Sequence, residues 1–229
     1  MKNLGPDAAR DLLLLSFVAG SADAAGYMGL GRVFTSNMTG NVVLLGIALA
    51  QHQRETVLRT LYVLVMFSFG IILGAVLART LVETAWRQLL IRTISLEIVL
   101  LATFALCWAL FPELGIFHYV LLALLAVAMG LQSATLNRLT IAGVTNTAVT
   151  GTLTSLVTGI GYLLAPPADQ ISPSPRRLGL LALVLIVYGG GALLSGLLIL
   201  RLRWAIGVVP VLCLLLVLVT HLKSIAKSR

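Results

Sequence analysis

Long apolar stretches dominate this sequence and constrain its fold more than any other feature. A helix needs about 20 mostly apolar residues to cross the roughly 30 Å hydrocarbon core of a bilayer. Six stretches meet this requirement: Leu12–Leu30, Thr56–Ala78, Ile94–Phe111, Tyr119–Leu136, Leu178–Leu200 and Trp204–Leu222. They lack the alternation of apolar and polar residues that barrel strands show. The sequence therefore predicts an all-α polytopic membrane protein, with residues 1–229 forming a single integral membrane domain.

The composition excludes several classes of soluble protein. Only 10% of the 229 residues are charged and 59% are hydrophobic, whereas an average soluble domain is about 25% charged. So few charges could not cover a water-soluble globule of this size, which excludes a soluble enzyme or a nucleic-acid-binding domain. The net charge of +8 is then an orientation signal at the ends of the helices. Cys107 and Cys213 both lie in apolar runs, so a disulfide scaffold is also excluded.

The first apolar stretch partly imitates a secretory signal. Lys2 and Arg10 precede an apolar run, and Ala22–Ala24 has the small residues of a cleavage site. However, the apolar stretch continues past the apparent cleavage site and has a counterpart later in the chain. We therefore interpret this segment as the first membrane span.

Two shorter apolar stretches, Asn41–Ala50 and Leu153–Pro166, each follow a polar run rich in Thr and Asn. Superposing Met38–Asn41 on Val149–Thr152 requires an offset of 111 residues. Each short stretch is preceded by a span that ends in small and polar residues and is followed by a Gly-rich span. This order predicts an internal duplication, with repeats at about 8–112 and 115–222.

The two short stretches decide the topology. If both cross the membrane, the protein has eight spans and parallel repeats; if both only dip into it, six spans remain and the repeats are inverted. The eight-span arrangement places nine basic residues inside and seven outside, whereas the six-span arrangement places eleven inside and five outside. The positive-inside rule favours six spans plus two short half-helices in an inverted repeat, with both termini in the cytoplasm.

The stretch Phe17–Tyr27, followed by Gly31–Asn41, closely resembles the YoaK family of uncharacterised bacterial inner-membrane proteins. The second-half runs Gly130–Ala134 and Thr147–Thr154 are similar to the same family. The resemblance covers essentially the full chain, and the Asn-Met-Thr-Gly-Asn block at residues 37–41 is specific. It implies a membrane protein of about six spans in the bacterial inner membrane, and it implies no particular substrate.

The polar runs before the short stretches are typical of helices that start within the membrane. Such a start exposes N–H groups carrying about half a positive charge, and Thr or Asn side chains can cap it. Irregular backbone at this depth must be buried in protein or line a cavity, and paired broken segments in inverted repeats point to a transporter's binding site. The alternative interpretation is that these polar residues only hold helices together.

Asp23 is the most informative single residue, because a charged group near the middle of a span costs at least ~2.5 kcal/mol. A carboxylate there would stay protonated unless it were paired, which suggests proton or cation coupling. The alternative is a neutral acid that is hydrogen-bonded to a neighbouring helix. Glu97 lies near Arg92 and could reach the membrane interface, which favours a structural ion pair. In the second half, Gln132, Ser133 and Asn137 take the place that Asp23 holds in the first, so a carboxylate site would be asymmetric.

We therefore expect a transporter or channel for a small polar or anionic solute, with proton coupling through Asp23 as an option. The expected substrate-binding residues combine the two polar runs with the second-half counterpart of Asp23: Asn37, Thr39, Gly40, Asn41, Gln132, Thr147, Thr150 and Gly151. The other hypothesis is a non-transporting membrane protein that acts as a structural or regulatory partner.

No enzyme is expected from this sequence. It has no phosphate-binding glycine loop with its Lys and no His pair at metal-ligand spacing, so we expect neither cofactor nor metal. An intramembrane protease would need a Ser–His or Asp–Asp pair, and no second Asp occurs within a span. The expected partners are the lipid bilayer and a small-molecule solute, with no nucleic acid; the oligomeric state, including a homo-oligomer, is left open.

Overall fold

The computed structural model describes residues 6–79, 86–111, 117–137, 149–165 and 174–227, and these ranges contain helices and no strands. The α-helices are α1 (Pro6–Gly29), α2 (Met38–Ala50), α3 (Arg54–Arg79), α4 (Trp86–Leu110), α5 (Phe117–Asn137), α6 (Val149–Leu164), α7 (Pro175–Arg201) and α8 (Val208–Lys227). A short 3₁₀ turn, η2 (Arg203–Ala205), connects α7 to α8. Among the described residues, six helices are long and apolar enough to cross a membrane, and α2 and α6 are the two shorter apolar helices. The prediction of an all-α membrane protein with six spans and two short helices is confirmed.

The bundle is organised around α1 and α5. Of the apolar windows in the spanning helices, 61% of the α1 window and 67% of the α5 window are buried, against 28% for α3 and 17% for α7. The apolar side chains of α3 and α7 therefore face the surroundings, as expected for helices in contact with lipid. α1 packs most extensively against α7, and α5 packs most extensively against α3.

Glycines bring these helix pairs into backbone contact. A Cβ atom at Gly20 of α1 would collide with the carbonyl of Tyr188, and one at Gly191 of α7 would collide with the carbonyl of Phe17. The α3–α5 pair repeats this arrangement, because a Cβ at Gly70 would meet the carbonyl of Val127 and one at Gly130 the carbonyl of Phe67. Small residues allow close packing of this kind in membranes, where dispersion contacts and hydrogen bonds drive helix association.

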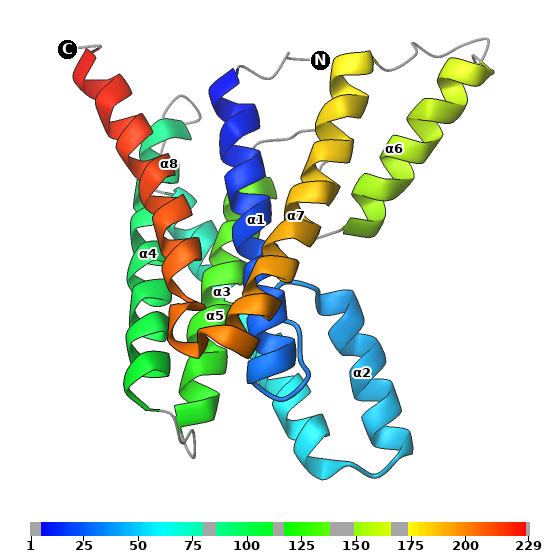
Figure 1. Ribbon diagram of the computed structural model, residues 1–229, viewed down its shortest axis with the longest axis vertical. Coiled ribbons are helices and arrows are strands. Elements are labelled where there is room, and N and C mark those ends of the chain that lie inside the picture. Colours follow the sequence, from blue (N-terminus) through cyan, green and yellow to red (C-terminus); the bar gives the residue numbers. More distant parts are fainter. Residues whose placement is uncertain (1–5, 80–85, 112–116, 138–148, 166–173, 228–229) are drawn as a thin grey trace.

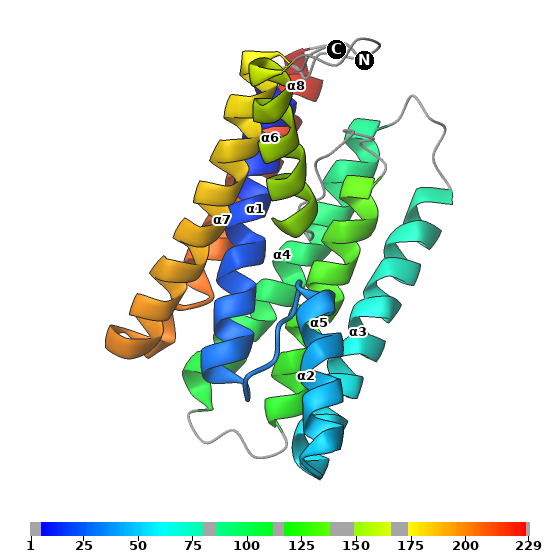
Figure 2. The same cartoon turned by 90° about the vertical axis from the view of Figure 1, so that its right-hand side faces the viewer.

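The helices run in two opposite directions (Figure 1). α1, α4 and α7 run away from the end of the bundle where α1 begins and α8 ends, which we call the terminal end, whereas α3, α5 and α8 run towards it. The opposite end is called the far end. α2 and α6 start near mid-height and extend to opposite ends, with their first turns lying opposite each other in both views (Figures 1 and 2).

The two short helices are buried at matching positions. In α2 the buried residues are Asn41 and Ala48, and in α6 they are Thr152 and Gly159. The offset of 111 residues found in the sequence relates Asn41 to Thr152 and Ala48 to Gly159, and it also relates the first residue of α2 to the first residue of α6. α2 packs against α3, and α6 packs against α7.

Candidate functional site

Asp23 lies in α1 and is 4% exposed. Its Oδ1 atom accepts hydrogen bonds from the backbone N–H groups of Thr35 at 2.7 Å, Ser36 at 2.6 Å and Asn37 at 3.4 Å. Its Oδ2 atom accepts from the Ser36 hydroxyl at 2.7 Å and from the Tyr188 hydroxyl of α7. Asp23 thus joins α1 to the segment before α2 and to α7, and every one of these contacts is a donor that stabilises a carboxylate.

The connection between α1 and α2 is irregular backbone, and several of its residues are fully buried, including Leu30, Val33 and Thr35 at 0% exposure. Asn41 supplies both halves of an amide clamp: its Oδ1 accepts from the Phe34 N–H at 2.9 Å and its Nδ2 donates to the Phe34 carbonyl at 2.6 Å. Because buried backbone groups need hydrogen-bond partners, Asp23 and Asn41 replace the hydrogen bonds that a helix would have made.

Two further side chains hold the turn that directly follows α1, at the far end of the bundle. His118 of α5 makes a 2.8 Å hydrogen bond to the Leu30 carbonyl, and Arg59 of α3 donates to the Gly31 carbonyl at 3.0 Å. Gly31 has a φ of +90°, in the left-handed region that glycine adopts at little cost. Side chains from α1, α2, α3, α5 and α7 therefore all converge on this one segment.

The start of α2 contains four of the expected substrate-binding residues. Asn37 is the N-cap, since its Oδ1 accepts from the Gly40 N–H at 3.2 Å. Thr39 follows within the first turn and is exposed. A Cβ at Gly40 would lie 3.0 Å from the Phe34 ring and 3.1 Å from Asn37 Nδ2, so the ring packs closely on the helix start. Asn41 is committed to the clamp on Phe34.

The corresponding positions in the second half are less enclosed. Thr150 and Gly151 lie exposed in the first turn of α6, while Thr147 is outside the described residues. Gln132 of α5 is 2% exposed and donates from Nε2 to the Leu15 carbonyl of α1 at 3.0 Å. Its Oε1 has no hydrogen-bond partner in the described part of the chain, and the same holds for the buried Thr35 Oγ1. The structure thus brings Asp23, Asn37, Thr39, Gly40 and Asn41 together and leaves Gln132 on a different helix pair.

Sequence reasoning missed the residues that complete the surroundings of Asp23. Tyr188 was one of many residues in an apolar span, although a buried tyrosine hydroxyl in a membrane usually has a partner and could have been noticed for that reason. Nothing in the local sequence indicates that Arg59 and His118 hold the connection before α2, because these contacts link residues 28 and 88 positions apart.

A second polar cluster was also missed, because the first span was expected to begin at Leu12. α1 begins earlier, and Asp11 within it is 4% exposed. Its Oδ2 atom lies 2.6 Å from Nε2 of His221 in α8, and its Oδ1 accepts from Arg10 at 2.9 Å. Arg10 also donates to the Thr220 hydroxyl at 3.0 Å. This cluster ties α1 to α8 at the terminal end.

The structural ion pair expected for Glu97 is not among the ion pairs of the described residues. Glu97 of α4 is 1% exposed, and its Oε1 atom has no hydrogen-bond partner among the described residues. The side chain is enclosed by the bundle, because the buried face of α4 continues on both sides of it through Ile94 and Leu101.

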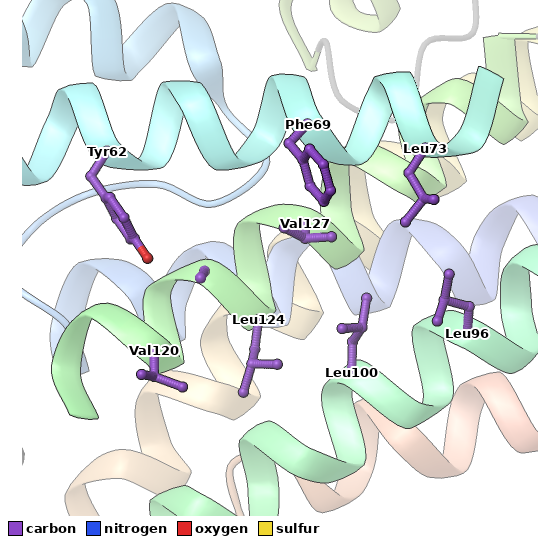
Figure 3. Close-up of a pocket in the computed structure, with 9 residues that line it drawn as sticks. Tyr62, Phe69, Leu73, Leu96, Leu100, Val120, Leu124 and Val127 are labelled. Atoms are coloured by element: carbon purple, nitrogen blue, oxygen red, sulfur yellow. The ribbon is translucent and has the colours of Figure 1, made fainter. Parts of the chain in front are cut away.

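An apolar groove with a volume of about 340 Å³ lies on the outside of the bundle, away from these polar clusters. Figure 3 shows its lining, from Tyr62, Phe69 and Leu73 on α3, Leu96 and Leu100 on α4, and Val120, Leu124 and Val127 on α5. The Tyr62 hydroxyl is the sole polar side-chain group among these residues, so the groove suits lipid chains and offers nothing to a polar solute. No group of three or more His, Cys, Asp or Glu side chains that could hold a metal ion occurs in the described ranges.

Comparisons with known proteins agree with this architecture. Residues 12–219 match a family model described as a protein of unknown function (DUF1275). The chain is 36% identical over 186 residues to the UPF0700 transmembrane protein YoaK of Bacillus subtilis (strain 168), a match that covers 81% of each chain. No solved structure matches. The chain therefore belongs to the DUF1275 family of membrane proteins, together with YoaK.

Proposed function

We propose that this protein moves a small polar or anionic solute across the membrane, through a site between the first turns of α2 and α6. The observation that carries this proposal is the placement of the two helices: both begin near mid-height and lie opposite each other there (Figure 2). Each helix start presents unsatisfied N–H groups with about half a positive charge. Two such starts near mid-height create a region that favours an anion or the negative end of a dipole.

The proposal treats the chain as an inverted repeat, in which α1–α4 correspond to α5–α8. The matched buried positions in α2 and α6 support it, as does the opposite direction of each corresponding pair of helices. Paired broken segments at the interface of inverted repeats are where secondary transporters bind their substrates. We also propose that the terminal end faces the cytoplasm of a bacterial inner membrane. The far end holds only Arg32, Arg54, Arg59, Arg201 and Arg203 of the basic residues in the described ranges.

The solute is proposed to be anionic because the two helix starts differ in charge. The carboxylate of Asp23 already occupies the position of an anion beside the segment that leads into α2. Between Phe117 and Leu164 the sequence contains no Asp or Glu, so α5 and α6 provide no built-in counter-charge of this kind. The partial positive charge at the start of α6 is therefore available to a bound anion, with Thr150 and Gly151 in the first turn of this helix.

In this proposal Asp23 is the coupling group, and its contacts indicate what a proton would change. A carboxylate can accept from all five donors around Asp23, whereas a protonated acid needs an acceptor for its own proton. Protonation would therefore weaken the contacts to Ser36 and Tyr188, which hold the α1–α2 connection against α7. Release of this junction would allow α7 to move relative to α1, as alternating access requires.

The experiment is a solute-flux measurement on purified protein in liposomes. Light scattering would follow the entry of small inorganic anions, small carboxylates and neutral polyols, with protein-free liposomes as the baseline. We expect at least one anion to enter faster than the baseline, and Thr39→Val combined with Thr150→Val to slow it. Thr103→Val is the matched control, because Thr103 is an exposed α4 residue whose hydroxyl donates only to its own helix at Val99.

Flux at the protein-free baseline for every solute would favour the other hypothesis, a non-transporting structural or regulatory membrane partner. Entry of neutral polyols without any anion would retain transport but remove the proposed role of the helix dipoles.

A further inference from the structure

Glu97 is a carboxyl group that belongs neither to the site around Asp23 nor to the Asp11–His221 cluster. It lies near the middle of α4, on the face that carries the buried residues Ile94, Leu101 and Phe104. At 1% exposure it is as enclosed as these apolar neighbours. A buried ionisable residue within a membrane span is a functional-site hypothesis by default, because its cost must be offset by something it does.

The neighbouring helices place apolar side chains at the level of Glu97. Gly207, just before α8, packs against Ala105 of α4, and the two helices run in opposite directions (Figure 1). Counting equal numbers of residues along each helix puts Glu97 level with the part of α8 around Leu214, which is 0% exposed. The stacked rings of Phe111 and Phe117 place the end of α4 beside the start of α5, and the same counting puts Glu97 level with the part of α5 that contains Met129 and Leu131, both 0% exposed.

Glu97 and Asp23 differ in what surrounds them. Asp23 accepts hydrogen bonds from three backbone N–H groups and two hydroxyls, which together can stabilise a negative charge. Glu97 has one buried oxygen without a partner and no ion pair among the described residues. An isolated carboxylate in such a medium costs so much that the group takes up a proton instead.

The titratable and charged groups on the packed elements do not change this conclusion. The titratable groups of α5 lie in its first turn. On η2, Arg203 lies over the Trp108 ring, and on α8, His221 is bound to Asp11. Cys213 is the nearest to the level of Glu97 and is uncharged as a thiol. The complete set on α4 and the elements packed against it, among the described side chains, is Arg54, Glu55, Arg59, Tyr62, Arg79, Arg92, Cys107, His118, Tyr119, Arg203, Cys213, His221 and Lys223.

We infer that Glu97 is a proton-binding site in the membrane interior, which holds its proton at neutral pH. The protonated state rests on the surroundings of Glu97 alone. Its use as a second coupling group besides Asp23, which requires exchange of this proton with the solvent, rests on the proposed transport function. The inverted arrangement provides no equivalent acid, because α8 contains no Asp or Glu, so proton binding at this position belongs to the first half.

Infrared spectroscopy on the purified, reconstituted protein tests the inference without any solute. A protonated carboxyl group has a carbonyl stretching band that a carboxylate lacks. Near neutral pH we expect this band in the wild type, its loss in Glu97→Gln, and its retention in the matched controls Asp23→Asn and Asp11→Asn. In D₂O the band should shift, because an exchangeable proton is replaced by deuterium.

Absence of the band in the wild type, or its persistence in Glu97→Gln, would overturn the assignment of the proton to Glu97. A band that does not shift in D₂O would show a sealed structural acid and would overturn its use as a coupling group. If Glu97→Gln fails to fold, labelling of the wild type with a hydrophobic carbodiimide replaces it. The protonated carboxyl adds across one C=N bond of the reagent, its oxygen bonding to the central carbon and its proton passing to nitrogen. Mass spectrometry should then find the reagent on Glu97, and labelling of other acids only would contradict the inference. Absence of solute flux through the wild type, with an intact infrared result, would count against the proposed function alone.

Discussion

The α1–α7 and α5–α3 junctions are built alike but carry different chemistry. Each brings two helices into backbone contact through one glycine on each helix, Gly20 with Gly191 in the first pair and Gly130 with Gly70 in the second. In the α1–α7 junction a buried carboxylate, Asp23, bonds to Tyr188 on the partner helix. In the α5–α3 junction, neither helix has an acid at the level of the junction glycines. Where α5 meets α1, the polar contact is made by the amide of Gln132.

This difference separates the scaffold from the chemistry. Packing through glycines depends on shape, and both halves of the chain retain it. Charge at membrane depth is expensive, and the first half contains both Asp23 and Glu97, whereas the apolar parts of α5–α8 contain no acid at all. We interpret the protein as a nearly symmetric frame in which one half handles protons and the other leaves its helix start open to an anion.

The largest effects should come from breaking the shared part of the comparison. Gly20→Val and Gly130→Val would each place a Cβ against a partner backbone carbonyl that cannot move aside. We expect each to cost more than about 3 kcal/mol, the upper end of ordinary overpacking, and to abolish folded protein in fluorescence-detected size-exclusion chromatography. Gly190→Val is the matched control, since nothing lies within 4 Å of a Cβ at Gly190. Loss of fold in Gly20→Val only would show that the two junctions are not equivalent.

Removing the charge from the α1–α7 junction should have the next largest effect. Asp23→Ala leaves the N–H groups of Thr35 and Ser36 buried without acceptors, which should cost about 3 kcal/mol. Asp23→Asn keeps one acceptor oxygen and should lower the melting temperature less. In proteoliposomes, Asp23→Asn should bind or exchange an identified solute while losing accumulation driven by a proton gradient. Uphill accumulation by this variant would exclude Asp23 as the coupling group.

The sequence supported the fold better than the site, for identifiable physical reasons. Apolar stretches of spanning length depend on local composition, so the six spans and the short helices could be predicted, as could the Asn37 cap. The partners of Asp23 could not, because Tyr188 lies 165 positions away and its contact depends on how α7 crosses α1. The burial of Glu97 could not be predicted, because hydropathy alone does not tell which face of a helix an acid occupies.

The amide clamp at the start of α2 sharpens the comparison between the short helices. Asn41→Leu removes both bonds to the Phe34 backbone and should cost about 2 kcal/mol, because buried N–H and C=O groups lose their partners. Thr152 is its counterpart in α6 and is also fully buried at 0% exposure. Thr152→Val should cost less, since it removes a single hydroxyl. Thermal melts of the purified variants measure both, and a larger loss in Thr152→Val would reverse the order.

The smallest effects on stability are expected at the exposed threonines. Thr39→Val and Thr150→Val should each change the free energy of unfolding by no more than about 0.5 kcal/mol, because both side chains are exposed. Their effect should appear instead in solute binding, measured as the shift in melting temperature that a bound solute causes. Unchanged solute binding in both variants, with normal expression, would mean that these hydroxyls serve packing only.

The central claim is that α2 and α6 start near the middle of the membrane and extend to opposite faces. Impermeant thiol labelling of Gln51→Cys and Leu164→Cys, with Cys107 and Cys213 replaced, tests it directly, because these residues lie at the outer ends of α2 and α6 and are exposed. We expect Gln51→Cys to be labelled from the periplasmic side and Leu164→Cys only after the cytoplasmic side is opened. Labelling of both cysteines from the same side would contradict the inverted arrangement and the solute site that depends on it.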